Sequence, residues 1–216
     1  MTSYFEEFTN AEAVLWNKYL NHPWMNGIRE GSLTSDQFQF FLVQDMPYQR
    51  DFLNALLITS TRVVDPQAFL TLRDFIAAEV DFEADLLDSA GVPWTFERWA
   101  AGPSREAYMN HLTRVAMEGT PGQVCAALLP CAAGFTGAMA EPSPKSSHPV
   151  IYQKWLEFYE RPEQFSFSSA LVRTFENEMA EAPATEIAHC KMIFTRSVQH
   201  QISVLDAAWR TEDPWQ

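Results

Sequence analysis

The stretch AALLPCAAGFTG, residues 126–137, places a proline and a cysteine inside a leucine-rich helical run. A proline in a helix interior removes one backbone N–H and clashes with the carbonyl four residues back, here that of Ala126. We therefore expect Pro130 to bend the helix and to leave polar backbone groups unpaired. Small residues follow Cys131 and leave open space beside its thiol, so this cysteine could attack a small substrate. Because a free cysteine is among the most buried residue types, a plain core position is the alternative, and this stretch alone favours it.

The composition is that of an ordinary soluble globular protein, with 216 residues of which 47% are hydrophobic and 20% charged. A chain of this length suits one domain, and we expect a single domain over residues 1–216. The net charge of −13 argues against unaided binding to nucleic acid or to an anionic membrane, because phosphate contacts need clustered Lys and Arg. No run of 18 apolar residues is present, so no membrane span is expected.

Two features predict the cellular compartment. The first ten residues, MTSYFEEFTN, lack the basic and apolar regions of a signal peptide. The three cysteines, Cys125, Cys131 and Cys190, do not follow the spacing of a disulfide framework. We therefore expect reduced thiols in a cytoplasmic protein.

Helical periodicity and helix-boundary signals divide the chain into helices, and no segment alternates as a strand would. Thr34 and Gln37 have the pattern of a capping box, which should open a long helix through about Val64. The most loop-like stretch is the Ser/Pro-rich segment 141–149. The other helices are expected over residues 3–20, 23–31, 66–90, 103–118, 150–159, 162–182 and 184–210, with one more around Cys131. The predicted fold class is all-α, a compact multi-helix bundle of about eight or nine helices.

A second interrupted stretch lies around Pro47, inside the long helix that follows Thr34. Asp45 and Tyr48 are three residues apart there, so they share one helix face. Asp45 has apolar neighbours and could point into the bundle, where a carboxylate must be paired or hydrogen-bonded. A solvent-facing acid near Arg50 is the alternative, and spacing alone does not separate the two. Both helix-interior prolines lie within two residues of a candidate polar group, and local breaks in a helix often mark functional sites.

A metal site is not expected. Glu186 and His189 have the Glu-x-x-His spacing of di-iron carboxylate bundles, but those sites need a second copy, and the sequence has none. No glycine-rich phosphate loop and no Gly-x-Ser-x-Gly elbow is present either.

Several short motifs, taken in order along nearly the whole chain, resemble the TenA family of thiaminase II-like aminopyrimidine hydrolases. They are His22-Pro23, Gln44-Asp45 with Tyr48, Ala107-Tyr108, LLPC ending at Cys131, Tyr152-x-x-Trp155 with Tyr159, and the closing helix from Ser197 to Trp209. The resemblance implies a heme-oxygenase-like all-α fold, assembly as a homo-oligomer (dimer or tetramer), and no metal or organic cofactor. It also implies cleavage of the bond between an aminopyrimidine-CH2 group and a leaving nitrogen, as in thiamin degradation and salvage.

The resemblance also assigns roles to residues. Cys131 matches the nucleophile that adds to the pyrimidine ring, and Asp45 matches the aspartate that binds the aminopyrimidine edge. Tyr48, Tyr108 and Tyr159 match pocket tyrosines that position and stack the ring. A thiolate is intrinsically very nucleophilic, and a hydrogen-bonded neighbour can raise its population.

The sequence departs from the family at the position of its proton-transferring glutamate, which our alignment places at Gln201. The amide of Gln201 can hold a substrate, but it cannot serve as acid or base, a role that contributes about 10²–10⁴-fold in rate. Phe52 and Phe135 stand where tyrosines are common, which removes two hydroxyls and predicts a less polar substrate-binding pocket.

Three hypotheses follow. The chain is an active aminopyrimidine hydrolase that uses Cys131, a related hydrolase acting on a different small amine, or a non-catalytic pyrimidine-binding or regulatory homologue, because Gln201 replaces the glutamate. We favour an enzyme because Asp45, Cys131 and the three tyrosines are all present. The physiological substrate, the oligomeric state and the group that transfers protons stay open.

Overall fold

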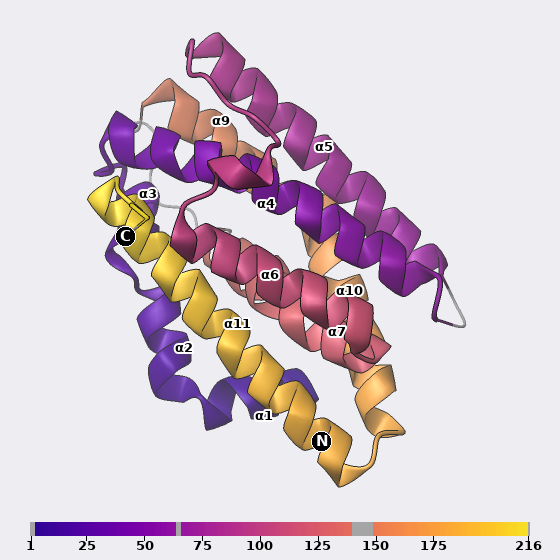
Figure 1. Ribbon diagram of the computed structural model, residues 1–216. Helices are drawn as coiled ribbons and strands as arrows, with labels where there is room; N and C mark the ends of the chain where they lie inside the picture. Colours follow the sequence, from indigo (N-terminus) through magenta and orange to yellow (C-terminus); the bar gives the residue numbers. More distant parts are fainter. Residues whose placement is uncertain (1–2, 64–65, 140–148, 216) are drawn as a thin grey trace.

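The computed structural model describes residues 3–63, 66–139 and 149–215, and these residues form helices joined by short connections (Figure 1). The all-α prediction is confirmed, and no strand occurs in the described ranges. The predicted loop at 141–149 lies outside them except for Pro149. The elements are α1 (Tyr4–Ala11), α2 (Ala13–Leu20), α3 (Pro23–Glu30), α4 (Ser35–Ser60), α5 (Gln67–Ser89), the 3₁₀ turn η1 (Arg98–Ala100), α6 (Pro103–Glu118), α7 (Pro121–Leu129), the π-helix η2 (Pro130–Phe135), α8 (Thr136–Met139), α9 (Val150–Tyr159), α10 (Pro162–Ala180) and α11 (Ala184–Arg210).

The expectation of one helix over residues 3–20 is wrong, because the chain breaks at Glu12 into α1 and α2. The break allows α1 to pack on α10 while α2 packs on α11. The start of α1 is held by a tertiary contact, since the backbone N–H groups of Tyr4 and Phe5 donate to the Glu176 carboxylate of α10, both at 2.9 Å. The hydrophobic periodicity of one segment does not reveal a contact with a helix that is distant in the sequence.

Local signals place most other helix ends correctly. Thr34 and Gln37 form the expected capping box at the start of α4. Gly31 ends α3 in the left-handed conformation, with φ of 73°, which a glycine adopts without steric cost. Helix α4 runs through Pro47 but ends at Ser60, earlier than Val64, and Pro66 precedes α5 as its cap instead of occupying its first turn.

The irregularity predicted at Pro130 takes the form of the π-helix η2, which carries Cys131. Its widened turns fit the proline into an otherwise helical path, and such segments frequently occur at functional sites. Two carbonyls of the π-helix accept hydrogen bonds from side chains of other helices. The Tyr19 hydroxyl donates to the carbonyl of Pro130 at 3.0 Å, and the Ser168 hydroxyl donates to that of Ala132 at 2.6 Å.

The Tyr19 hydrogen bond provides a stability prediction. We expect Tyr19→Phe to lower the free energy of unfolding by about 1–3 kcal/mol, because the buried Pro130 carbonyl loses its donor. Urea denaturation measures the change. Tyr152→Phe is the matched control, since the Tyr152 hydroxyl donates to the Leu33 carbonyl at the same 3.0 Å distance and should cost a similar amount. Unchanged stability in Tyr19→Phe alone would mean that another donor satisfies the π-helix.

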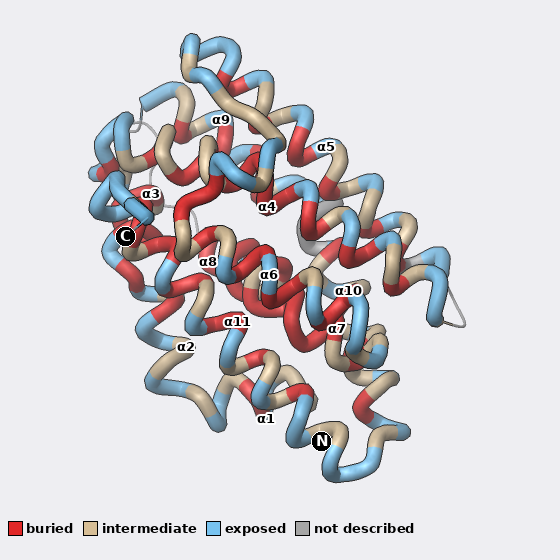
Figure 2. The backbone as a smooth tube through the Cα atoms, viewed as in Figure 1, coloured by how far each residue is buried: buried red, intermediate tan, exposed pale blue. Residues whose placement is uncertain are grey.

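Helix α7 and the π-helix form the centre of the bundle, with α6, α10 and α11 packed around α7 (Figure 2). By length and composition the segment Pro121–Met139 is apolar enough to cross a membrane, yet 78% of its most apolar window is buried inside the fold. That burial is typical of a core helix. On the opposite face, α4 packs between α5 and α6.

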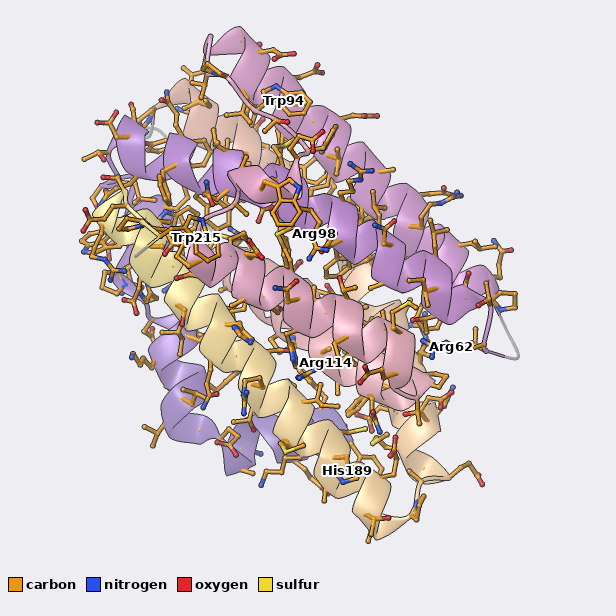
Figure 3. All side chains as sticks on the ribbon, viewed as in Figure 1. Arg62, Trp94, Arg98, Arg114, His189 and Trp215 are labelled. Atoms are coloured by element: carbon orange, nitrogen blue, oxygen red, sulfur yellow. The ribbon has the colours of Figure 1, made fainter. Side chains whose placement is uncertain are left out.

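One surface cluster holds α4 against α6. Figure 3 shows Arg98 beside α4 and α6. Arg98 of η1 forms an ion pair with Asp51 of α4 at 3.2 Å and donates to Asn110 of α6 at 2.8 Å. This cluster fixes the spacing of two helices that both contribute side chains to the cavity described next.

Candidate active site

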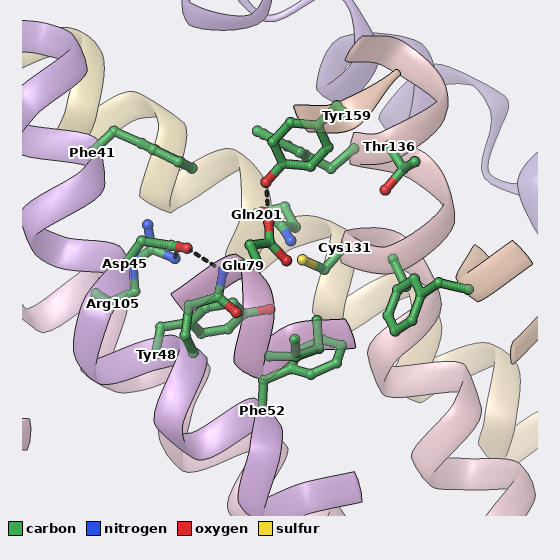
Figure 4. A pocket seen from close by; sticks show the side chains of 15 residues that line it. Phe41, Asp45, Tyr48, Phe52, Glu79, Arg105, Cys131, Thr136, Tyr159 and Gln201 are labelled. Atoms are coloured by element: carbon green, nitrogen blue, oxygen red, sulfur yellow. Dashed lines mark hydrogen bonds and ion pairs between the residues drawn. The ribbon is translucent and has the colours of Figure 1, made fainter. Parts of the chain in front are cut away.

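A single cavity brings together side chains that lie far apart in the sequence (Figure 4). Cys131 of η2 and Asp45 of α4 both line it, so the thiol and the carboxylate share one hollow. Helices α5, α6, α9, α10 and α11 supply further lining side chains. Seven of the eight residues predicted from the sequence line this cavity, namely Asp45, Tyr48, Phe52, Cys131, Phe135, Tyr159 and Gln201.

Asp45 is buried and points into the bundle, so the solvent-facing alternative is wrong. Its Oδ1 accepts from Arg105 Nη1 at 2.7 Å, and its Oδ2 accepts from Gln49 Nε2 at 2.9 Å. The Arg105 guanidinium also lies over the rings of Phe41 and Tyr48, at 5.3 and 4.9 Å from their centroids. Burial raises the pKa of Asp45, while the charge of Arg105 opposes that rise. The pair therefore presents a carboxylate that is already oriented and partly neutralised.

Cys131 is partly buried and lies at the π-helical bend with its thiol on the cavity. Burial raises the pKa of this thiol to about 12, and the nearby carboxyls of Asp45 and Glu79 add to the effect. The nearby Tyr48 hydroxyl favours the thiolate and so lowers the pKa of Cys131, which offsets part of this rise. The same hydroxyl has no hydrogen-bond partner of normal geometry in the described structure. At neutral pH the resting sulfur is thus a protonated thiol, and a nucleophilic role requires a neighbouring group that accepts its proton.

Glu79 of α5 is a lining residue that the sequence reasoning missed. Its carboxyl is buried and accepts a hydrogen bond from the Tyr159 hydroxyl. Burial raises its pKa to about 8, and the negative charge of Asp45 contributes, while the bond from Tyr159 lowers it. A carboxyl with a pKa near neutrality can both accept and return a proton, which makes Glu79 suited to acid–base chemistry.

A second buried acid, Glu83, lies one helical turn beyond Glu79. It is fully buried, accepts from Trp155 Nε1 at 3.1 Å, and does not line the cavity. A sequence signal for both acids does exist. Glu79 and Glu83 continue the spacing of Leu72 and Ile76 along α5, so both acids occupy positions where helical periodicity predicts apolar core residues.

Tyr108 is the predicted residue that does not line the cavity. Its ring packs behind that of Tyr48, with centroids 5.0 Å apart and planes tilted by 31°, and its hydroxyl accepts from Gln201 Nε2 at 3.4 Å. His200 packs on Tyr108 at 5.5 Å between ring centroids and also lies off the cavity. Tyr108 therefore supports two lining residues, Tyr48 and Gln201, from behind.

Glu186 of the Glu-x-x-His motif has a structural role. The Glu186 carboxylate accepts two hydrogen bonds from the Gln123 amide, at 2.9 and 3.0 Å, and so joins α11 to α7. Within the described ranges no three potential metal ligands converge.

Comparison with known proteins matches residues 11–211 to the model of the TENA/THI-4/PQQC family. The aminopyrimidine aminohydrolase of Halalkalibacterium halodurans is 26% identical over 203 residues, which cover 90% of each chain. The protein of the same name from Bacillus subtilis is 26% identical over 220 residues, which cover 96% of this chain and 90% of that one. A TenA homologue from P. horikoshii superimposes with a TM-score of 0.85 at 20% identity, covering 97% of this chain and all of the other. This likeness shows the shared all-α, heme-oxygenase-like fold.

Proposed function

This chain belongs to the TENA/THI-4/PQQC family, and we propose that it is a thiaminase II-like hydrolase that cleaves an aminopyrimidine-CH2–N bond through Cys131. The observation that carries the proposal is the shared cavity, where a thiol and an ion-paired carboxylate face one aromatic-walled space. Two relatives named aminopyrimidine aminohydrolase, each 26% identical, support the same substrate class.

In the proposed reaction, the Cys131 sulfur adds to the ring carbon beside the one that bears the exocyclic methylene. The ring electrons then form a double bond to the methylene and expel the leaving nitrogen. Water adds to the methylene, the electrons return to the ring, and the sulfur departs. Covalent addition of this kind divides one difficult displacement into two easier steps.

Asp45 binds the amino group of the ring in this proposal. Arg105 and Gln49 each use one carboxylate oxygen, and each oxygen keeps a second lone pair for the amino N–H. The rings of Phe41, Tyr48 and Phe135 provide flat apolar walls for the pyrimidine.

The test is turnover of aminomethyl-aminopyrimidine. We expect equal amounts of ammonia and hydroxymethylpyrimidine, measured by coupled ammonia detection and chromatography. The other two hypotheses predict different results. A rise in melting temperature with hydroxymethylpyrimidine but no product would favour a non-catalytic binder, whereas ammonia from other small amines alone would favour a related hydrolase.

A further inference from the structure

The charges around the cavity do not balance. Arg105 is the only cationic side chain among the described lining residues, and Asp45 already uses it at 2.7 Å. Glu79 lines the same cavity and has no cationic partner among the residues that the structure describes, and Glu83 adds a third acid behind it. A buried carboxyl without a counterion remains protonated, because the charged form is costly to bury. The cavity is therefore suited to a ligand that brings one positive charge.

We propose that Glu79 is the counterion for an ammonium group on the exocyclic methylene of the substrate, and that it accepts the Cys131 proton when the sulfur adds to the ring. The inference rests on the proposed function and deepens it in two ways. It says that the amine of the proposed substrate binds as its cation, and it identifies an acid–base residue in a chain where Gln201 cannot transfer protons.

Groups from every neighbouring element act on Glu79. The titratable and charged side chains facing it are Asp45 and Tyr48 of α4, Arg105 of α6, Cys131 of η2, Tyr159 of α9 and Glu83 of its own helix. Gln49 of α4, Gln201 of α11 and Phe167 of α10 are among the uncharged side chains that line the same cavity, and the Gln49 amide lowers the pKa of Glu79. With its pKa near 8, Glu79 is mostly protonated at pH 7 before a ligand binds. An arriving ammonium group stabilises the carboxylate, so binding should expel a proton.

The step balances in atoms and charge. In the complex, Glu79 is a carboxylate, the substrate is an ammonium ion and Cys131 is a thiol. Glu79 takes the thiol proton as the S–C bond forms, and the C–N bond breaks with its electron pair leaving on nitrogen, so neutral ammonia departs with its own three hydrogens. Water then forms the C–O bond. Glu79 gives its proton to the departing sulfur and receives one from the water.

This role fixes the direction of the pH dependence. The reactive complex needs an ionised Glu79, and the free enzyme binds a proton there with a pKa of about 8. We therefore expect kcat/KM to rise with pH up to about 8 and to fall once the substrate amine loses its own proton. The Glu79→Gln variant should lack the rise, because its amide does not titrate.

The binding test uses the Cys131→Ala variant, which cannot turn the ligand over. Calorimetry at pH 7 in two buffers of different ionisation enthalpy measures the protons released on binding. We expect proton release with aminomethyl-aminopyrimidine and none with neutral hydroxymethylpyrimidine. Adding Glu79→Gln should remove the release and weaken binding of the amine by about 10-fold or more. Adding Glu83→Gln instead, on the same helix but off the cavity, should preserve both the proton release and the affinity for the amine.

The turnover test separates this inference from the proposed function. With Cys131 present, Glu79→Gln should lower kcat by about 10²–10⁴-fold, and adding Gln201→Glu should restore part of the loss by returning a carboxyl to the cavity. If the wild-type protein turns the amine over and Glu79→Gln retains that rate, the role of Glu79 is wrong while the proposed function stands. If no protein turns over, the proposed function fails, and proton release on binding still decides whether Glu79 is the counterion. Equal binding of amine and alcohol in all variants would overturn the inference.

Discussion

Replacing Cys131 with alanine should lower the turnover of aminomethyl-aminopyrimidine by on the order of 10⁴-fold or more, the scale of losing a covalent nucleophile. Binding should persist, because Asp45 and the aromatic walls remain in place. Ammonia release measures the loss, and the shift in melting temperature with hydroxymethylpyrimidine measures the retained binding.

Cys125 provides the matched control for this experiment. It is a fully buried thiol in α7, six positions earlier in the chain, and it does not line the cavity. Cys125→Ala should therefore keep its turnover while losing some stability to a small void. Full turnover in Cys131→Ala would contradict the nucleophile hypothesis, and equal losses of turnover in Cys131→Ala and Cys125→Ala would indicate a packing effect.

The second large effect concerns stability. We expect Arg105→Met to lower the free energy of unfolding by about 3–5 kcal/mol at pH 7, because it leaves the Asp45 carboxylate buried without its ion-pair partner. Methionine keeps much of the apolar stem of arginine, so the loss reports mainly on the guanidinium charge, which pairs with Asp45 and lies over the rings of Phe41 and Tyr48. Urea denaturation measures it.

The charge explanation has a direct check. Adding Asp45→Asn to Arg105→Met removes the unpaired charge, so the double variant should recover much of the stability that the single variant loses. Lowering the pH should help the single variant as well, because protonation of Asp45 removes the same charge, and burial already raises its pKa. If the loss in free energy of unfolding is the same in the single and double variants, and does not change when the pH is lowered, it results from lost packing.

Local sequence signals were sufficient for most of the helices. The Thr34–Gln37 capping box, Gly31 and the Gly102–Pro103 start each act through neighbouring backbone groups, so their effect is readable without tertiary information. The break at Glu12 was not readable, because the two helices it separates pack on different partners, α1 on α10 and α2 on α11, and those contacts exist only in the folded bundle.

Motif order along the chain likewise predicted that Cys131 and Asp45 belong to one site, and they do line one cavity. The sequence did not predict what surrounds them. Arg105 reaches Asp45, and Glu79 reaches the cavity, only after α6 and α5 pack on α4. That packing decides the pKa values as well, since burial is the largest cause of the raised pKa of both Cys131 and Glu79.

The sequence by itself determined the all-α class and most helix boundaries, because periodicity and caps depend on residues close together in the chain. The resemblance of its motifs to a family made Cys131 and Asp45 the candidate thiol and carboxylate. Only the tertiary structure decided that Asp45 is ion-paired, that Cys131 rests as a thiol and that Glu79 faces it. Desolvation and charge pairing depend on side chains from several helices at once, and their distances exist only in the packed bundle.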